Sequence, residues 1–228
     1  MRDAYSIQDV EVVRSADLAG FESYLNTLHR HRLGNVFDIT LTAPEQRQAH
    51  DLLRSYFHPL PPGVSSARRA NTLFAFHGCK ASVVTSIVTS GFGNLSLLDP
   101  GYFGKGYYLT PNAEYAAMYA CGDIAGVVPE ADKATGFFPV LMCALAVGTC
   151  YPVTRVVDYP HSDPTLAASG HSKLYDRPLH SKCDAHFAPV HESKGFQCVD
   201  AELAQFSELV LNQYQAALPL AILWIKKK

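Results

Sequence analysis

Residues 101–110 read GYFGKGYYLT and hold three glycines, one lysine and three tyrosines in ten positions. Glycines beside a lysine are typical of phosphate-binding loops and tyrosines are typical of aromatic stacking, so the stretch indicates a nucleotide. A P-loop needs a glycine at position 99 and a Ser or Thr after the lysine, but Asp99 and Gly106 occupy those places. A dinucleotide-binding turn needs a third glycine where Leu109 stands. If a nucleotide binds here, it binds in another way.

The pattern on both sides of this stretch predicts a mixed α+β domain. Residues 42–45, TAPE, form a capping box with proline at the first helical position, and Gly91 provides a helix stop for an ambiguous apolar segment. Residues 158–195 are rich in His, Pro, Ser and Gly and are expected to be mostly loop. Helices are predicted from Ser15 to near Gly34, from 44 to 56, from 80 to 92 and after Thr110; strands are predicted at 5–15, 72–78, 137–148, 207–214 and 220–225, the last two joined across Pro219.

The composition fits a globular domain and argues against two classes of partner. The chain has 228 residues, of which 48% are hydrophobic and 18% charged, so a full apolar core is available. A formal charge of −2 gives no basic field for nonspecific nucleic-acid binding. No stretch approaches the roughly 20 apolar residues of a membrane span, and residues 1–13 lack the apolar run of a signal peptide. We therefore expect a soluble protein with no membrane partner.

The six cysteines contain no CxxC pair, and no secretion signal accompanies them. We interpret them as reduced thiols of an intracellular protein, cytoplasmic or nuclear, with an effector delivered into another cell left open as an alternative. The segment from His180 to Cys198 holds the densest group of histidines, but its spacings match no common zinc pattern. We interpret this segment as a polar surface loop and expect no metal.

Three places in the chain carry residue types suited to a binding or catalytic site. His77 and Gly78 end a buried strand, and Tyr108 ends the glycine-rich stretch, with Tyr119 eleven residues later on a helix. Glu208 opens an apolar strand, where an unpaired carboxylate would be costly. Taken singly, each has a structural explanation: a hydrogen-bonded histidine, a packed tyrosine pair or a solvated glutamate.

In order and spacing, these motifs resemble the catalytic domain of poly(ADP-ribose) polymerase-like ADP-ribosyltransferases. The resemblance rests on the His-Gly strand end, on FGKGYYLT (103–110) with the helical tyrosine after it, on ELVLNQYQAALP (208–219), and on YSIQDVEVVRSADLAGFESYL (5–25). It covers nearly the whole chain and is weakest at 150–205. The fold that it implies is an α+β domain of two packed, mostly antiparallel sheets with flanking helices.

The resemblance implies a catalytic triad of the diphtheria-toxin type, formed by His77, Tyr108 and Glu208. His77 would hydrogen-bond the adenosine-side ribose of NAD, and the Gly78 backbone would hold the nicotinamide amide. Glu208 would contact the 2′-hydroxyl of the nicotinamide ribose. Because the departure of nicotinamide leaves an oxocarbenium-like sugar, a fixed carboxylate stabilises charge that exists mainly in the transition state. Glu208 is therefore expected to affect turnover more than binding.

The resemblance also implies residues that enclose the nicotinamide ring. Tyr108 would form one side of the nicotinamide pocket, Tyr119 would stack on the ring from the other side, and Gly106 would keep the backbone close to the ligand. Residues 92–102 correspond to the donor-site loop that covers NAD. The glycines and tyrosines of 101–110 then form a wall beside nicotinamide rather than a phosphate cradle.

Two positions depart from the family pattern. Ala116 stands where members usually have a serine that bonds the nicotinamide amide, so a weaker affinity for NAD is expected. Cys79 follows the His-Gly pair, where Ser or Thr is more usual, and we interpret it as a packed thiol.

The function implied by the resemblance is transfer of ADP-ribose from NAD to an acceptor, with release of nicotinamide. The expected acceptor is a protein side chain, of another protein or of the chain itself, and single transfer is preferred over elongation. Two alternatives stay open: an NAD glycohydrolase that uses water at the same site, and a noncatalytic module that binds NAD or ADP-ribose. We expect one catalytic domain over 1–228, with an N-terminal strand and helices at 1–70 and the NAD-binding core at 71–228.

Overall fold

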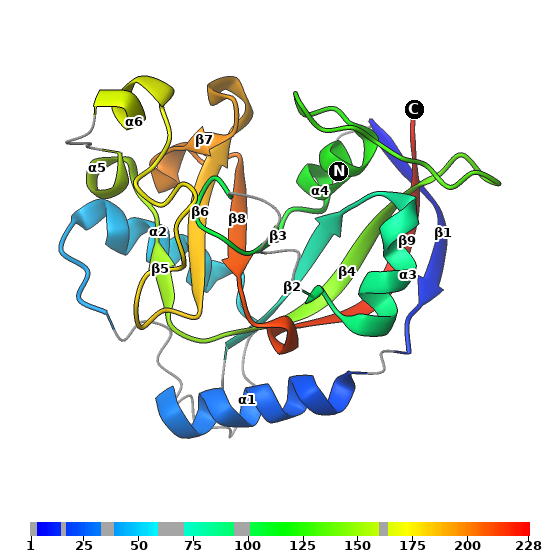
Figure 1. Cartoon of the computed structure of the whole chain (residues 1–228), viewed down its shortest axis with the longest axis horizontal. Helices are drawn as coiled ribbons and strands as arrows, with labels where there is room; N and C mark the ends of the chain where they lie inside the picture. The colour runs from blue at the N-terminus through cyan, green and yellow to red at the C-terminus, as the bar shows by residue number, and fades with distance from the viewer. Residues whose placement is uncertain (1–3, 15–16, 33–38, 59–70, 94–100, 160–163) are drawn as a thin grey trace.

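The computed structural model describes residues 4–14, 17–32, 39–58, 71–93, 101–159 and 164–228, which form two β-sheets surrounded by helices (Figure 1). The strands are β1 (Tyr5–Val12), β2 (Asn71–Gly78), β3 (Tyr107–Leu109), β4 (Phe138–Val147), β5 (Cys150–Pro152), β6 (Ala185–His191), β7 (Gln197–Cys198), β8 (Phe206–Leu211) and β9 (Ala217–Lys227). One sheet has the order β1-β9-β4-β2 and the other β3-β8-β6-β5, with β7 paired to β6. Among the described strand pairs only β5 and β6 run parallel. The predicted α+β domain with two mostly antiparallel sheets and flanking helices is confirmed.

The helices lie around the two sheets. Helix α1 runs along the bottom of the view in Figure 1, and α4 lies near the top, beside β2. No helix in the described part of the chain is long and apolar enough to cross a membrane. The helices are α1 (Leu18–Arg32), α2 (Pro44–Ser55), α3 (Ala81–Ser90), α4 (Ala113–Cys121), α5 (Arg155–Asp158) and α6 (Pro164–Ser169).

A shared hydrophobic core holds the sheets together. Leu73 and Leu145 from the first sheet and Phe187 and Leu209 from the second are fully buried in one cluster. Burial of side chains of this size stabilises the fold by about 1.5–3 kcal/mol each. The sheets also meet through the backbone, since Phe76 exchanges hydrogen bonds of 2.7 and 3.0 Å with Thr110, just after β3. This bridge brings the end of β2 beside the glycine-rich stretch.

The helix predictions are largely confirmed, with one change at a helix cap. Helix α2 begins at Pro44 as expected, but Gln46 rather than Glu45 closes its first turn. The Gln46 side-chain oxygen accepts hydrogen bonds from the backbone N–H groups of Thr42 (3.1 Å) and Ala43 (3.3 Å). Because Ala43 rather than Thr42 is the N-cap, the third helical position is occupied by Gln46 and not by Glu45. The predicted boundaries of the first helix, at positions 15 and 34, lie outside the described residues.

Two predictions about the second half of the chain need correction. The prediction of mostly loop at 158–195 does not hold for the whole segment: residues 170–184 contain no helix or strand, but β6 lies inside the second sheet between β8 and β5. Six of the seven residues of β6 are buried. Its histidines made this core strand look like a polar loop in the sequence. Pro219 does not separate two strands either, because it lies inside β9, opposite Cys143 at a register shift between β9 and β4. Proline is tolerated in a strand at such an irregularity.

Candidate active site

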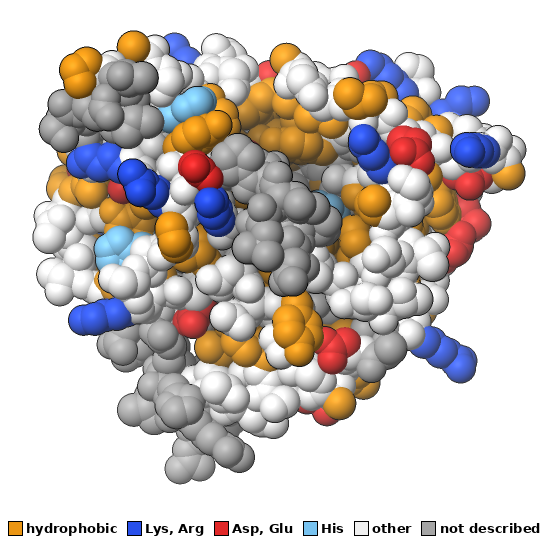
Figure 2. All heavy atoms as spheres, viewed as in Figure 1, with side chains coloured by type: hydrophobic (Ala, Val, Ile, Leu, Met, Phe, Trp, Pro, Cys, Tyr) orange, Lys and Arg blue, Asp and Glu red, His pale blue; other side chains and the backbone are white. Residues whose placement is uncertain are grey.

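A pocket of about 800 Å³ opens where β2, β3, β8 and α4 meet. Figure 2 shows hydrophobic side chains gathered in the hollow near the top of the molecule, over the region between β7 and α4. All six site residues predicted from the sequence line this pocket: His77, Gly78, Gly106, Tyr108, Tyr119 and Glu208. The structure therefore brings together residues that are up to 131 positions apart in the chain (208 − 77).

His77 connects two walls of the pocket. Its Nδ1 lies 2.7 Å from the backbone carbonyl of Tyr108, which can only accept a hydrogen bond, so Nδ1 carries the proton. Burial lowers the pKa of His77, which keeps the imidazole neutral and leaves Nε2 as an acceptor. The ring edge also packs on Phe92, with centroids 5.2 Å apart. His77 is thus held in one tautomer, suited to accepting a hydrogen bond from a hydroxyl group.

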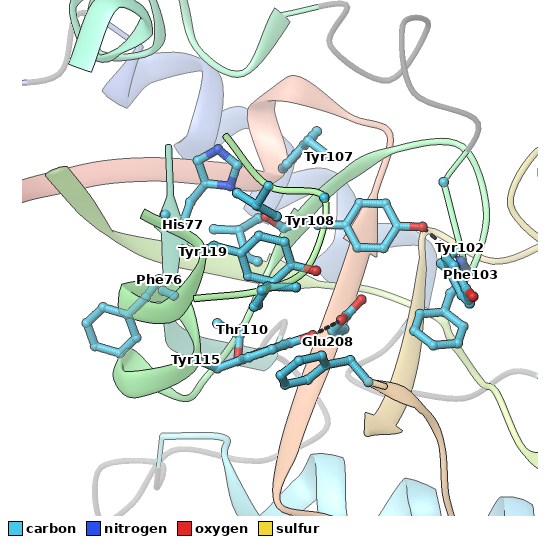
Figure 3. Close-up of a pocket in the computed structure, with 18 of the residues that line it drawn as sticks. Phe76, His77, Tyr102, Phe103, Tyr107, Tyr108, Thr110, Tyr115, Tyr119 and Glu208 are labelled. Carbon is cyan, nitrogen blue, oxygen red and sulfur yellow. Dashed lines mark hydrogen bonds between the residues drawn. The ribbon is translucent and has the colours of Figure 1, made fainter. Parts of the chain in front are cut away.

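Glu208 places a carboxyl group in an apolar part of the pocket. It is the third residue of β8, lies opposite Ala188 of β6, and is only 5% exposed. Burial raises the pKa of Glu208 to about 7, while a hydrogen bond from Tyr115 lowers it. The Tyr115 hydroxyl donates to Glu208 Oε1 over 2.5 Å (dashed line in Figure 3). A carboxylate in this setting interacts strongly with positive charge that develops beside it.

Tyr115 lies four residues before Tyr119, a spacing that places both tyrosines on one face of α4. It is 1% exposed and lines the pocket from α4. Its ring stacks on Phe206 (centroids 4.9 Å apart, planes at 3°) and on Phe196 (5.0 Å, 25°). The helical spacing predicts that the two tyrosines share a face, but nothing in the sequence pairs Tyr115 with Glu208.

The glycine-rich stretch folds around the hydroxyl group of Tyr108. That hydroxyl donates to the carbonyl of Gly104 (2.8 Å) and accepts from the N–H of Phe103 (2.9 Å). Gly101 has φ +64°, and a Cβ there would lie 2.1 Å from the Gly104 carbonyl oxygen. A residue with a side chain would therefore be strained and would collide with the turn. The first glycines of the stretch serve this turn around the tyrosine.

His186 also stabilises the turn around Tyr108. No function was predicted for this residue from the sequence. It is fully buried on β6; its Nδ1 donates to the carbonyl of Phe103 (2.6 Å), and its Nε2 accepts from the backbone N–H of His180 (2.6 Å). Burial lowers the pKa of His186 to about 4. A Cβ at Gly104 would lie 3.0 Å from His186 Nδ1, so the absence of a side chain at this position leaves room for the histidine ring. The sequence pattern does not predict β6 and therefore does not predict this contact.

Replacing His186 with leucine should lower the free energy of unfolding by about 2–3 kcal/mol at pH 7.5, because the buried carbonyl of Phe103 and the partly buried N–H of His180 lose their partners. The unfolded histidine takes up a proton below about pH 6.5 and the folded one only near pH 4, so wild-type stability falls on acidification. The difference in unfolding free energy between wild type and His186→Leu should therefore be about 2 kcal/mol smaller at pH 5 than at pH 7.5. Urea denaturation at both pH values measures it. His191→Leu, at the partly exposed end of β6, is the control; equal losses in both variants would contradict the proposed anchoring.

Two other glycines permit close approach between elements. A Cβ at Gly78 would lie 2.0 Å from the backbone oxygen of Ala116, so α4 contacts β2 directly. A Cβ at Gly106 would lie 2.4 Å from the backbone oxygen of Leu211, so β3 contacts β8 directly. The sequence-based reason for Gly106 was close approach to a ligand; the structure shows close approach to a neighbouring strand.

The remaining pocket predictions concern α4 and the segment after β2. Tyr119 lies one turn after Tyr115, with their rings edge to face at 5.2 Å, and Ala116 lines the pocket between them. Cys79 packs against the main core and is absent from the described pocket lining. Burial raises its pKa to about 12, as expected for an unreactive packed thiol. Of the predicted donor-site loop at 92–102, positions 94–100 lie outside the described residues.

The charged residue of the glycine-rich stretch does not line the pocket. Lys105 forms a half-exposed ion pair with Asp176 (2.9 Å), and its backbone N–H donates to the carbonyl of Arg177 (2.7 Å). The described residues contain no group of three or more His, Cys, Asp or Glu side chains that could hold a metal ion. The titratable side chains in the described pocket lining are five tyrosines, His77 and Glu208.

Comparison with known proteins adds little to this geometry. No protein-family model matches the chain, and no curated protein matches it in sequence. Among solved structures, the chain is similar to the PARP domain of Arabidopsis RADICAL-INDUCED CELL DEATH1, with a TM-score of 0.49 and 12% sequence identity over 99% of this chain and 90% of that one. A similarity at this level assigns no family, so the functional argument depends on the site itself.

Proposed function

We propose that the chain is an ADP-ribosyltransferase that cleaves NAD, releases nicotinamide and transfers ADP-ribose to an acceptor. The observation that carries this proposal is the position of Glu208, a buried carboxyl group in the same pocket as His77, Tyr108 and Tyr119. Burying a carboxylate is costly, and the cost is offset when the charge stabilises a cationic transition state. NAD is proposed as the substrate because of the sequence resemblance, and the residues that line the pocket suit NAD.

In the proposed reaction the bond between nicotinamide and ribose C1′ breaks, and its electron pair leaves with neutral nicotinamide. The sugar becomes oxocarbenium-like, an oxygen or nitrogen atom of the acceptor bonds to C1′, and the acceptor proton passes to solvent. Glu208 accepts a hydrogen bond from the 2′-hydroxyl and stabilises the positive sugar. His77 accepts from a hydroxyl of the other ribose through Nε2, the nitrogen left unprotonated by its bond to Tyr108.

The tyrosines are proposed to bind the nicotinamide ring. Tyr108 and Tyr119 line the pocket from β3 and α4, and each aromatic contact contributes about 0.5–1.5 kcal/mol beyond the area that it buries. Ala116 contributes no side-chain hydrogen bond beside them, so the affinity for nicotinamide-like compounds is expected to be modest. The backbone around Gly78 would hold the carboxamide.

We further propose that one ADP-ribose unit is added rather than a chain. The described lining of the pocket contains no lysine or arginine, and its wall near α4 is apolar, formed by Ile124, Ala125, Gly126 and Val127. Extension requires an ADP-ribose already attached to bind as acceptor, so a second pyrophosphate would have to be held beside that of NAD, and pyrophosphate favours cations. A protein side chain suits this apolar wall better.

The two alternatives are separated by the fate of the ADP-ribose. An NAD glycohydrolase would use the same residues and water, whereas a binding module would have no need for a charge-stabilising carboxylate. Intact-mass spectrometry after incubation with NAD, together with measurement of free nicotinamide, distinguishes all three. We expect nicotinamide and a protein adduct of one ADP-ribose unit per site. Nicotinamide with no adduct, even with added protein acceptors, would favour the glycohydrolase, and no nicotinamide would favour the module.

A further inference from the structure

We propose that Tyr115 is a positioning residue for the reaction: its hydroxyl group holds one oxygen of the Glu208 carboxylate and directs the other toward the ribose. This inference rests on the transferase function proposed above and adds a residue to which the sequence resemblance gives no role. Three observations support it: the contact itself, the packing of the Tyr115 ring, and the set of groups around Glu208.

The contact joins two buried side chains on different elements. Tyr115 on α4 and Glu208 on β8 are 1% and 5% exposed, and the hydroxyl lies 2.5 Å from Oε1 (Figure 3). With Oε1 occupied, the carboxylate has a defined rotation, which leaves Oε2 for a substrate hydroxyl. Preorganisation of this kind matters because a catalytic group that is displaced by about 1 Å loses much of its effect.

Two aromatic rings stack on the Tyr115 ring and hold it in place. Phe206 precedes Glu208 by two residues on β8 and stacks nearly parallel to the ring, with planes at 3°. Phe196, in the segment before β7, covers it at 25° and itself lines the pocket. The hydroxyl position is therefore set by stacking as well as by its hydrogen bond, and a phenylalanine at 115 would keep the stacking and lose only the bond.

In the part of the chain that the structure describes, no lysine or arginine lines the pocket around Glu208 to share this role. Among the described residues, Tyr115 is hydrogen-bonded to Glu208 and Cys198 of β7 interacts with it electrostatically. The other titratable side chains that line the pocket are His77, Tyr102, Tyr107, Tyr108 and Tyr119. Burial holds the pKa of Tyr115 far above its usual range, so this residue stays an O–H donor at every working pH. Its hydrogen bond opposes the effect of burial on the pKa of Glu208. Tyr115 therefore favours the charged form of Glu208 that the reaction needs.

The test compares wild type with Tyr115→Phe in the pH dependence of nicotinamide release from NAD. The wild-type kcat/KM should rise with pH and level off above an inflection near pH 7, as Glu208 ionises. In Tyr115→Phe the inflection should move up by about one pH unit, and kcat should fall by about tenfold to a hundredfold, with KM within about threefold. Tyr151→Phe is the matched control, because it removes a buried hydroxyl–carboxylate bond to Asp158 (2.8 Å) outside the pocket.

A second measurement does not need turnover. Carbon-13 NMR of labelled glutamate side chains, with the Glu208 signal identified by its loss in Glu208→Gln, should show Glu208 titrating at higher pH in Tyr115→Phe. An active wild type with an unchanged profile in Tyr115→Phe would overturn the positioning role. An inactive wild type whose Glu208 titration still moves in Tyr115→Phe would overturn the transferase function, while supporting control of Glu208 by Tyr115.

Discussion

Replacing Glu208 with glutamine is expected to slow nicotinamide release by about 10²- to 10³-fold while NAD binding is retained. Glutamine has nearly the same shape and can still accept the Tyr115 hydrogen bond through its amide oxygen. It lacks the negative charge, which contributes mainly once the glycosidic bond has begun to break. The rate should therefore fall through kcat, and the dissociation constant for NAD should change little. Steady-state kinetics and isothermal titration calorimetry measure the two quantities.

The same substitution should also change the pH dependence of the unfolding free energy, which distinguishes loss of the carboxyl group from misfolding of the variant. Glu208 has a pKa of about 7 in the folded protein against 4.5 for an unperturbed side chain, so between these values the folded state holds the proton more tightly. Its contribution to stability is thus present below about pH 4.5 and is lost as pH rises through 7. Relative to wild type, Glu208→Gln should gain about 3 kcal/mol of unfolding free energy between pH 4.5 and pH 8. A pH-independent difference would contradict the burial of a titrating carboxyl group.

Replacing Gly78 with alanine is expected to destabilise the protein by about 3 kcal/mol or more and to weaken NAD binding at least about tenfold. The added Cβ would meet the backbone oxygen of Ala116 at 2.0 Å, and backbone atoms cannot rotate away as a side chain could. Helix α4 would have to move from β2, taking Tyr115 and Tyr119 with it. Urea denaturation and calorimetry with NAD check the two effects.

Gly136→Ala is the control for this substitution. A Cβ at Gly136 has nothing within 4 Å, and its φ of +72° alone should cost about 1 kcal/mol. NAD affinity should be unchanged, since Gly136 is outside the described pocket lining. If Gly78→Ala were no more harmful than this control, α4 would not depend on close contact with β2.

The sequence predicts the fold well where hydrophobic patterns are regular. The helix that carries Tyr115 and Tyr119 is predicted after Thr110, and the strands that end beside His77 and contain Glu208 are predicted from apolar runs. The six site residues predicted from the order of these motifs all line one pocket in the structure. Their roles toward NAD stay predictions.

What the sequence did not reveal are contacts between distant segments. Tyr115 and Glu208 lie 93 residues apart, and no periodicity relates a helix face to a strand that it meets only in three dimensions. The role of His186 could not be predicted because a segment rich in histidine, proline and serine looks like a loop. In the structure the backbone of His186 pairs with β8. Gly106 was correctly read as a point of close approach, but the sequence cannot show whether a ligand or Leu211 approaches it.

The most direct test of the proposed site is a crystal structure of the Glu208→Gln variant with NAD, which should bind the substrate and cleave it far more slowly than wild type. The predicted result is a nicotinamide ring between Tyr108 and Tyr119, with the 2′-hydroxyl of its ribose beside Gln at position 208 and the other ribose at His77. NAD bound elsewhere, or a pocket left empty at saturating NAD, would contradict the assignment of this pocket as the site of NAD cleavage.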